Sequence, residues 1–126
     1  MMNILIADEF PIYRFIIRSY VSRCCPKASI VDVGNMADVT KEYSINKFDL
    51  LILDAHMAGS QGLEAFVAEA VKKAKVIIFT EYEINSTKTK RLRDLGVSAF
   101  LLKSASSKEV LDSFQAIFAT EEMKSA

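Results

Sequence analysis

Five polar residues in this sequence directly follow short apolar runs, and their side chains are of types that do chemistry together. They are two neighbouring acids, a third acid, a hydroxyl and an ammonium: Asp8, Glu9, Asp54, Thr80 and Lys103. Carboxylates gathered in one place repel one another unless a cation lies among them or some are protonated. Oxygen ligands without histidine or cysteine suit a hard cation, so we predict Mg²⁺, held by few carboxylates and several waters.

Near Mg²⁺, a carboxylate can act as a nucleophile toward a phosphoryl group, because the metal offsets the repulsion between two anions. Lys103 can then neutralise one phosphoryl oxygen, and Thr80 can donate a hydrogen bond to another. Backbone N–H groups in the turn at residues 55–59 add further donors. Each residue alone also has a structural interpretation, as a strand end, a helix cap or a surface charge. The joint pattern favours a single site.

Five short apolar runs are predicted to be the strands that position these residues. They are residues 3–7, 29–33, 50–53, 75–79 and 99–102. Three of the runs are continuously apolar, as in strands covered on both faces of a parallel sheet. The alternation of strand and helix patterns predicts an open parallel sheet with helices on both faces. Binding sites in such sheets form at the carboxyl ends of the strands, where the five polar residues fall.

The helices between these runs differ in how clearly the sequence predicts them. Residues 11–21 and 63–71 carry apolar side chains at helical spacing, and residues 106–109 form a capping box for the last helix. Residues 84–95 are rich in Lys and Arg and poor in large apolar residues. We interpret them as a loosely docked helix with a solvated face, ended by Gly96.

Length and composition indicate one domain, residues 1–126, in which residues 119–126 are a frayed tail or the start of a linker. A net charge of zero gives no general attraction to nucleic acid or anionic lipid. No apolar run is long enough to span a membrane and the N-terminus does not read as a signal peptide, so we expect a cytoplasmic protein.

The two cysteines, Cys24 and Cys25, are adjacent and exclude a disulfide framework. Metal binding or thiol catalysis by the pair is an alternative to the interpretation that we favour, a buried reduced pair.

The motifs around the five polar residues resemble those of receiver domains of two-component response regulators, over nearly the whole chain. They are ILIADE with Asp8 and Glu9, LLILDAHMAGSQG with Asp54, IFT with Thr80, and FLLKSAS with Lys103. The stretches ADEFPIYR and AFLLKSASSKEVL look most like the branch whose receivers often precede a helix-turn-helix DNA-binding domain. The resemblance implies a flavodoxin-like, doubly wound (βα)5 fold with the sheet order 2-1-3-4-5.

By the same resemblance, Asp54 is the phosphoacceptor, and a histidine kinase or a small phosphodonor is the source of the phosphoryl group. Mg²⁺ would be held by Asp8, Glu9, Asp54 and the backbone carbonyl of His56. Such a domain is a regulatory phosphoacceptor in signal transduction, not an enzyme acting on a separate substrate.

The resemblance also implies a switch. Thr80 and Lys103 would respond to the phosphorylated state, and Phe100 would swing inward as Thr80 moves. These changes would bias a two-state surface on the fourth helix, fifth strand and fifth helix. Through that surface the domain would form a homodimer or control an output in transcription regulation. DNA binding would belong to a C-terminal domain outside this sequence, and this domain itself would contact neither nucleic acid nor membrane.

Three residues, Ala58, Glu81 and His56, bear on two alternative functions: an interaction module that is not phosphorylated, and a phosphatase. Ala58 stands where the family commonly has proline, which should loosen the turn, and Glu81 stands where a small residue is usual, so that it could crowd an acyl phosphate. A receiver-like interaction module that works without phosphorylation is therefore the second hypothesis. A phosphatase of another α/β family usually needs a second carboxylate two residues past the nucleophile, where this chain has its only histidine, His56. We interpret His56 as a solvent-facing residue at the rim of the site that can tune hydrolysis of the phosphoryl bond.

Overall fold

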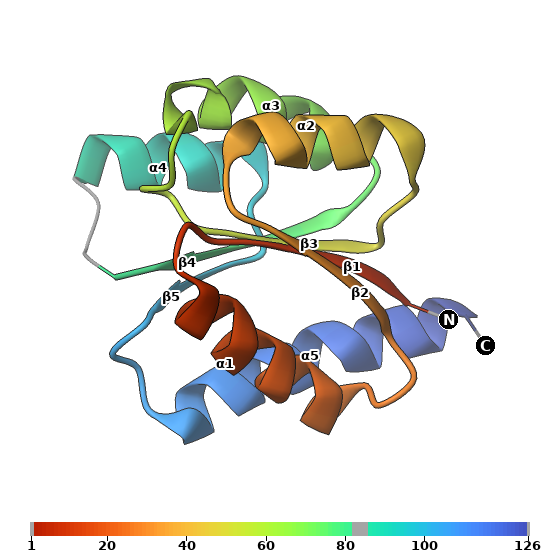
Figure 1. The fold of residues 1–126 in the computed structure, drawn as a ribbon. Helices are drawn as coiled ribbons and strands as arrows, with labels where there is room; N and C mark the ends of the chain where they lie inside the picture. Colours follow the sequence, from red (N-terminus) through yellow and green to blue (C-terminus); the bar gives the residue numbers. More distant parts are fainter. Residues whose placement is uncertain (1, 82–85, 126) are drawn as a thin grey trace.

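A single five-stranded parallel sheet forms the centre of the molecule, between two layers of helices (Figure 1). The structure is a computed structural model that describes residues 2–81 and 86–125. The strands lie in the order β2-β1-β3-β4-β5, and their bounds are β1 (Asn3–Ala7), β2 (Ser29–Val33), β3 (Leu50–Leu53), β4 (Lys75–Thr80) and β5 (Ala99–Leu102). The predicted strands and the flavodoxin-like order are confirmed. Strand β4 is one residue longer than its apolar run, because it includes Thr80.

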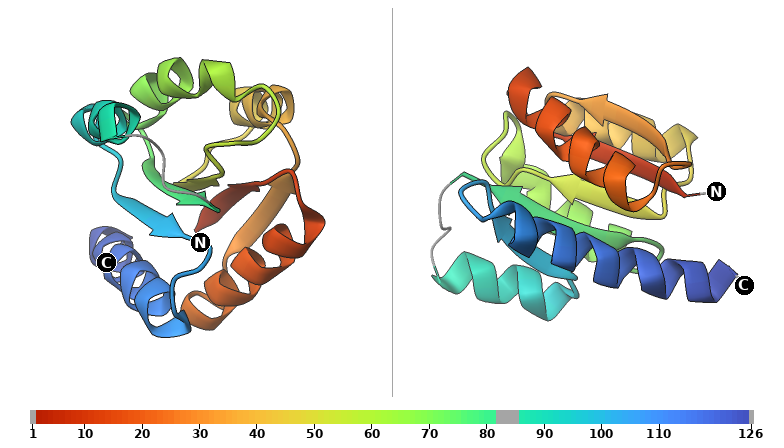
Figure 2. Two further views of the ribbon diagram at one scale, coloured as in Figure 1. Left: turned by 90° about the vertical axis from the view of Figure 1, so that its left-hand side faces the viewer. Right: turned by 90° about the horizontal axis from the view of Figure 1, so that it is seen from below.

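Helices cover both faces of the sheet (Figure 2). The first layer holds α1 (Pro11–Cys24) and α5 (Ser107–Ser125), and the second holds α2 (Met36–Ile45), α3 (Leu63–Ala70) and α4 (Ser86–Leu95), with a short 3-10 turn at Ser60–Gly62 before α3. The hydroxyl of Ser106 accepts the N–H of Glu109 at 3.2 Å, which confirms the predicted cap of α5. Within residues 2–81 and 86–125, no helix combines the length and apolar character that a membrane crossing requires.

Alternate strand residues face opposite helical layers, which explains why β1 and β3 are almost wholly apolar. Leu5 and Leu51 pack with side chains of α2, α3 and α4, whereas Ile4 and Ile52 pack with side chains of α1 and α5. All four are fully buried. Because a shift of one residue would exchange the two faces, this burial stabilises the register that brings the strand ends together.

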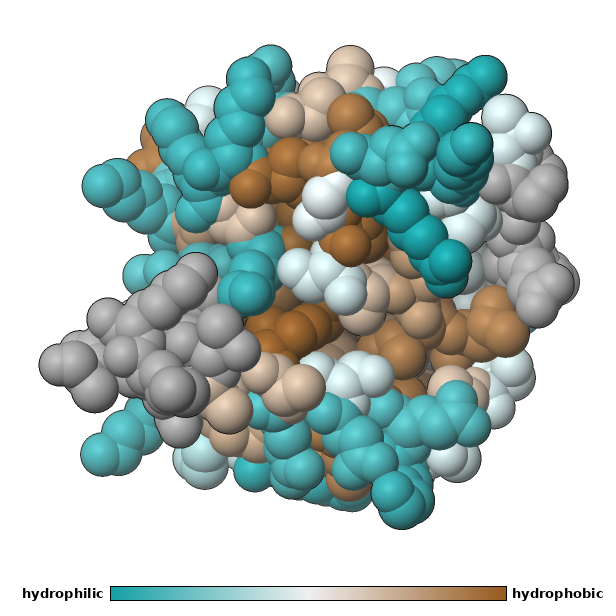
Figure 3. Space-filling model, turned by 180° about the vertical axis from the view of Figure 1, so that it is seen from behind, coloured by the Kyte–Doolittle hydropathy of each residue, from teal (hydrophilic) through white to brown (hydrophobic). Residues whose placement is uncertain are grey.

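Helix α4 has the solvated basic face that the sequence predicted. Leu92 is fully buried in the apolar cluster shared with α2 and α3, whereas Lys90, Arg91 and Arg93 are exposed. Gly96 follows the helix with φ of 108°, a left-handed conformation that ends it. Seen from behind, hydrophilic side chains gather around a band of apolar ones (Figure 3).

The cysteine pair lies at the end of α1. Cys24 is the last residue of the helix, Cys25 is its C-cap, and both are free and half-buried. Burial raises the pKa of the Cys24 thiol, and the neighbouring Cys25 adds to the effect. A raised pKa keeps a thiol protonated and weakly nucleophilic, in agreement with a structural role.

Candidate functional site

Backbone contacts hold Asp8 at the carboxyl end of β1. Its N–H donates to the carbonyl of Val33 at 3.0 Å, and its side-chain Oδ1 accepts the N–H of Phe10 at 2.9 Å. Nη1 of Arg14 donates to the carbonyl oxygen of Asp8 at 2.7 Å, while Nε of Arg14 is paired with Asp32 of β2 at 3.2 Å. The loop from β1 to α1 is thus tied to β2, and it carries a carboxylate that is fully buried.

Asp54 occupies the equivalent place at the end of β3. Its N–H donates to the carbonyl of Ala7 at 3.0 Å, which continues the pairing of β1 with β3. Its side-chain Oδ1 accepts the N–H of His56 at 3.0 Å. With Oδ1 engaged in this turn and the side chain only 5% exposed, the other oxygen, Oδ2, points into the cluster of strand ends.

The turn that follows Asp54 is anchored to α2. The carbonyl of Ala58 accepts the N–H of Met36 at 3.0 Å. Gly59 has φ of 82°, and a Cβ at this position would lie 3.1 Å from Cβ of Met36, so the turn requires glycine. This backbone contact anchors the turn to α2 through a carbonyl that proline would also offer, so the loosening effect of Ala58 stays a prediction.

Lys103, at the end of β5, contacts residues at the ends of three other strands. It follows β5, and its N–H donates to the carbonyl of Thr80 at 2.8 Å. Its Nζ lies 2.6 Å from Oδ2 of Asp8 and 3.3 Å from Oδ2 of Asp54, and its side chain is 2% exposed. Two carboxylates and one ammonium leave this buried cluster with one net negative charge when all three are ionised.

The electrostatics of Asp8 follow from its burial. Removal from water raises the pKa of this carboxyl above its ordinary value of 3.8. The ammonium of Lys103 and the N–H of Phe10 oppose the effect, and the charge of Asp54 adds to it. Because the folded protein binds this proton more tightly than the unfolded chain does, Asp8 contributes stability below the unfolded pKa. That contribution is lost as the pH rises through the folded pKa.

Two buried oxygen atoms in the cluster lack a hydrogen-bond partner among the described residues, namely Oδ2 of Asp8 and Oγ1 of Thr80. Oδ2 of Asp8 is nevertheless ion-paired with Nζ of Lys103 at 2.6 Å. Buried polar atoms are usually satisfied, because an unmade hydrogen bond costs about 1–3 kcal/mol. The hydroxyl of Thr80, which has neither an ion pair nor a hydrogen bond among the described residues, therefore marks a place where a polar ligand would be stabilised.

The remaining predicted residues lie at or beyond the rim of the cluster. The side chains of Glu9, His56 and Glu81 are exposed. Phe100 is half-buried in β5 against the apolar core, and the guanidinium of Arg93 lies 5.2 Å from the centre of its ring. In the described part of the chain, no three acidic, His or Cys side chains are grouped closely enough to hold a metal. The inward swing of Phe100 and the ligand role of Glu9 stay predictions.

Sequence reasoning missed an aromatic side chain at the cluster. Tyr13 was expected only as part of the apolar stripe of α1, but Nζ of Lys103 lies 3.9 Å from the centre of its ring. The ring of Phe10 lies 5.9 Å from the same atom. The signal in the sequence is two aromatic residues within one helical turn of the paired acids at residues 8–9.

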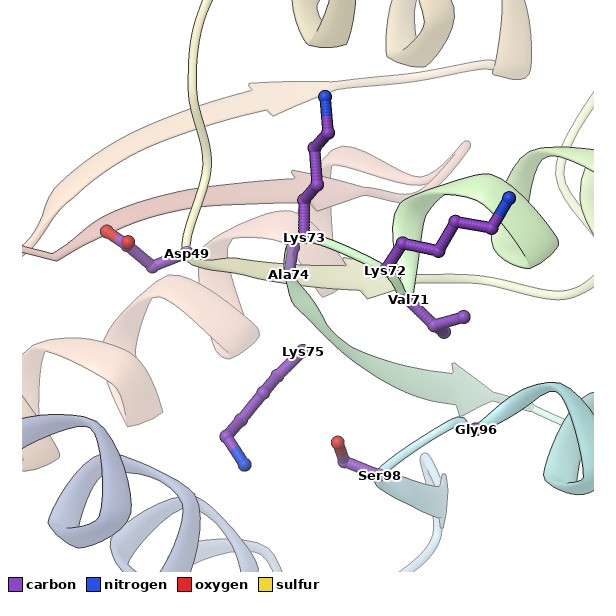
Figure 4. Close-up of a pocket in the computed structure, with 8 residues that line it drawn as sticks. All are labelled: Asp49, Val71, Lys72, Lys73, Ala74, Lys75, Gly96 and Ser98. Carbon is purple, nitrogen blue, oxygen red and sulfur yellow. The ribbon is translucent and has the colours of Figure 1, made fainter. Parts of the chain in front are cut away.

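A separate pocket of about 340 Å³ opens at the opposite edge of the sheet, lined by Asp49, Val71, Lys72, Lys73, Ala74, Lys75, Gly96 and Ser98. Its lysine side chains point in different directions (Figure 4), and Lys72 is paired with Glu69 at 3.1 Å. The positive charges of this pocket do not converge on one point.

Residues 4–115 match the family model of the response regulator receiver domain. The match includes every strand end described above, from Asp8 to Lys103. The chain therefore belongs to the family of response regulator receiver domains, which are regulatory domains of two-component signal transduction.

Two curated relatives illustrate where such domains occur. The response regulator UvrY of Escherichia coli (strain K12) is 25% identical over 120 residues, which cover 94% of this chain and 55% of the relative. The response regulator protein VraR of Staphylococcus aureus (strain Mu3) is 28% identical over 117 residues, covering 88% of this chain and 54% of the relative. The chain thus spans little more than half the length of these relatives.

Solved structures share the fold at lower identity. The response regulatory domain of protein MrkE from Klebsiella pneumoniae has a TM-score of 0.83 at 16% identity, covering 97% of this chain and 99% of that one. The isolated receiver domain of RcsB from Salmonella enterica serovar Typhimurium, in the presence of the phosphomimetic BeF3−, has a TM-score of 0.79 at 20% identity, with 96% and 88% covered.

Proposed function

We propose that this domain accepts a phosphoryl group on Asp54 and thereby switches a surface that controls an output or a partner. The observation that carries the proposal is the cluster of Asp54, Lys103 and Thr80. One oxygen of Asp54 lies 3.3 Å from the ammonium of Lys103. Strand β4, which pairs with β3, ends at Thr80, whose buried hydroxyl has no hydrogen-bond partner among the described residues. These groups match what phosphoryl transfer to a carboxylate requires: a nucleophile, a positive charge and a donor.

In the proposed reaction an oxygen of Asp54 attacks phosphorus and forms an acyl phosphate. The bond from phosphorus to the donor breaks, and its electron pair leaves with the donor, which is a histidine nitrogen of a kinase or the acetate of acetyl phosphate. Lys103 neutralises charge on a phosphoryl oxygen, and Thr80 donates its hydroxyl proton in a hydrogen bond to another. Hydrolysis of the acyl phosphate would return the domain to its starting state.

The cluster fits a hard divalent cation through its oxygen atoms. Asp8 and Asp54 both direct an Oδ2 toward Nζ of Lys103, so two carboxylate oxygens already lie around one cation. We propose that these two carboxylates and the carbonyl of His56 hold Mg²⁺, with Glu9 contributing from the rim. Two carboxylates with a carbonyl suffice, since Mg²⁺ retains several waters. Bound there, Mg²⁺ would offset the repulsion between the carboxylate and the phosphoryl oxygens.

The output is proposed from the relatives. UvrY and VraR are response regulators of which this chain covers little more than half, and one RcsB structure is a complex with promoter DNA. By analogy, a histidine kinase in the cytoplasm would phosphorylate this domain. The domain would then regulate transcription through a separate DNA-binding domain, without touching DNA itself. The proposed switch moves Thr80 and Phe100 and favours a homodimer through α4, β5 and α5.

The proposal is tested by incubating the protein with acetyl phosphate and Mg²⁺ and recording its intact mass. We expect a mass increase of one phosphoryl group that is lost with EDTA and in Asp54→Asn. Asp112→Asn, which changes an exposed acid of α5, is the matched control and should be phosphorylated like the parent. Equal phosphorylation of Asp54→Asn and the parent would contradict the proposal.

A phosphorylation-independent interaction module is the second candidate. It is favoured by the position of Lys103, which already satisfies much of the charge of Asp8 and Asp54, and by the exposed Glu81 next to Thr80. This candidate predicts no adduct and no saturable binding of Mg²⁺. The mass measurement combined with a Mg²⁺ titration separates the two functions.

A further inference from the structure

We propose that Tyr13 is a positioning residue for Lys103, and that its ring holds the ammonium against Asp8 and Asp54 so that phosphoryl transfer is efficient. The inference rests on the proposed function, because it assigns a role within the same reaction.

The ammonium of Lys103 contacts two carboxylates and the face of an aromatic ring. Nζ of Lys103 lies 2.6 Å from Oδ2 of Asp8 and 3.3 Å from Oδ2 of Asp54. It also lies 3.9 Å from the centre of the Tyr13 ring, well inside the range of a cation–π contact. With the side chain 2% exposed, the ring contributes where water would otherwise solvate the charge. The face of an aromatic ring attracts a cation more strongly when both are shielded from water.

Core packing does not account for the position of Tyr13. Its ring is half-buried, and it is absent from both apolar clusters that cover the faces of the sheet. Tyr20, seven residues or about two helical turns further along α1, differs from Tyr13 in this respect. Its side chain packs against one of those clusters and meets Phe114 edge-to-face. Among the described residues, the ring of Tyr13 contacts Lys103 and Phe10, which it meets edge-to-face at 6.2 Å.

The first turn of α1 presents the ring in a fixed place. The N–H of Tyr13 donates to the carbonyl of Phe10 at 3.1 Å, and Pro11 at the first helical position restricts the backbone. The neighbouring Arg14 ties this turn to Asp8 and to Asp32 of β2. The ring of Tyr13 and the carboxylate of Asp8 are therefore held by one hydrogen-bonded segment, and both contact the ammonium of Lys103.

Loss of the ring should affect the rate of transfer more than the binding of Mg²⁺. Without it, the long side chain of Lys103 gains water and conformational freedom, and its charge is less well aligned with a phosphoryl oxygen. We expect Tyr13→Leu to lower the maximal rate of adduct formation from acetyl phosphate about tenfold. The Mg²⁺ concentration for half-maximal rate should change by less than about twofold, because the ring supplies no oxygen ligand.

Tyr13→Phe and Tyr20→Leu are the controls. Phenylalanine keeps the aromatic face, so Tyr13→Phe should react like the parent. Tyr20→Leu removes a half-buried tyrosine of the same helix away from the ammonium, so any general damage to α1 would appear there as well. A rate for Tyr13→Leu equal to that of the parent would overturn the inference. So would an equal loss in Tyr20→Leu, or a Tyr13→Phe variant as slow as Tyr13→Leu.

A second measurement keeps this inference separate from the proposed function. Protons on the ε-carbon of Lys103 should show an upfield ring-current shift by NMR, retained in Tyr13→Phe and lost in Tyr13→Leu. If the parent forms no adduct although the shift is present, the proposed function fails while the contact stands, and the positioning role in transfer falls with it. If the parent forms the adduct but the shift is absent, the function stands and this inference is wrong.

Discussion

Replacement of Lys103 by methionine should tighten the binding of Mg²⁺ while it slows phosphorylation. The ammonium of Lys103 lies 2.6 Å from Asp8 and 3.3 Å from Asp54, so it competes with a divalent cation for the same two carboxylates. Methionine has a similar length and no charge. The variant removes the competitor and leaves the oxygen ligands in place.

The magnitude follows from Coulomb's law. Two unit charges about 4 Å apart interact by about 1 kcal/mol in water and by about 4 kcal/mol near a protein surface. A bound divalent ion would push the flexible ammonium outward, so we use the lower value, doubled for the charge of Mg²⁺. The resulting ~2 kcal/mol corresponds to roughly thirtyfold tighter binding.

The assay is a calorimetric titration with Mg²⁺, followed by urea unfolding with and without Mg²⁺. The metal-free Lys103→Met variant should be less stable than the parent, because it buries carboxylates without a partner. Mg²⁺ should restore that stability. Lys108→Met, which removes an exposed lysine of α5 paired with Asp112, is the control for charge alone. Unchanged or weaker binding of Mg²⁺ by Lys103→Met would refute the reasoning.

Three further predictions concern the supports of the site. Asp8→Asn, without Mg²⁺ at neutral pH, should unfold at a higher urea concentration than the parent, because burial raises the pKa of Asp8 and so disfavours its charged form. The difference between the two proteins should shrink as the pH falls through the pKa of Asp8, and a difference that stays constant with pH would contradict this prediction. Gly59→Ala should cost about 1–2 kcal/mol in urea unfolding, since φ is 82° and Met36 lies 3.1 Å from the new Cβ. Arg14→Ala should cost about 1–3 kcal/mol in the same assay, because the backbone carbonyl of the buried Asp8 loses a donor at 2.7 Å. Arg18→Ala, which removes a more exposed partner of Asp32, should cost less.

Much of the fold and of the candidate site could be predicted from the order of residues alone. Strands β1 and β3 are continuously apolar because both of their faces are covered, and that pattern is visible in the sequence. In a parallel sheet every carboxyl end lies at the same edge. Asp8, Asp54 and Lys103, each directly after a strand, therefore had to lie near one another.

The pairing of side chains at that edge was decided by the tertiary structure. The sequence did not indicate that Lys103 lies closer to Asp8 than to Asp54, or that the neighbouring Glu9 is exposed. It assigned Tyr13 to an apolar stripe, although the ring contacts the ammonium. The spacing of apolar residues in the sequence indicates which face of a single helix or strand is buried. Which atoms meet across β1, α1 and β5 depends on loop paths, side-chain reach and burial, and these exist only once the strands have assembled.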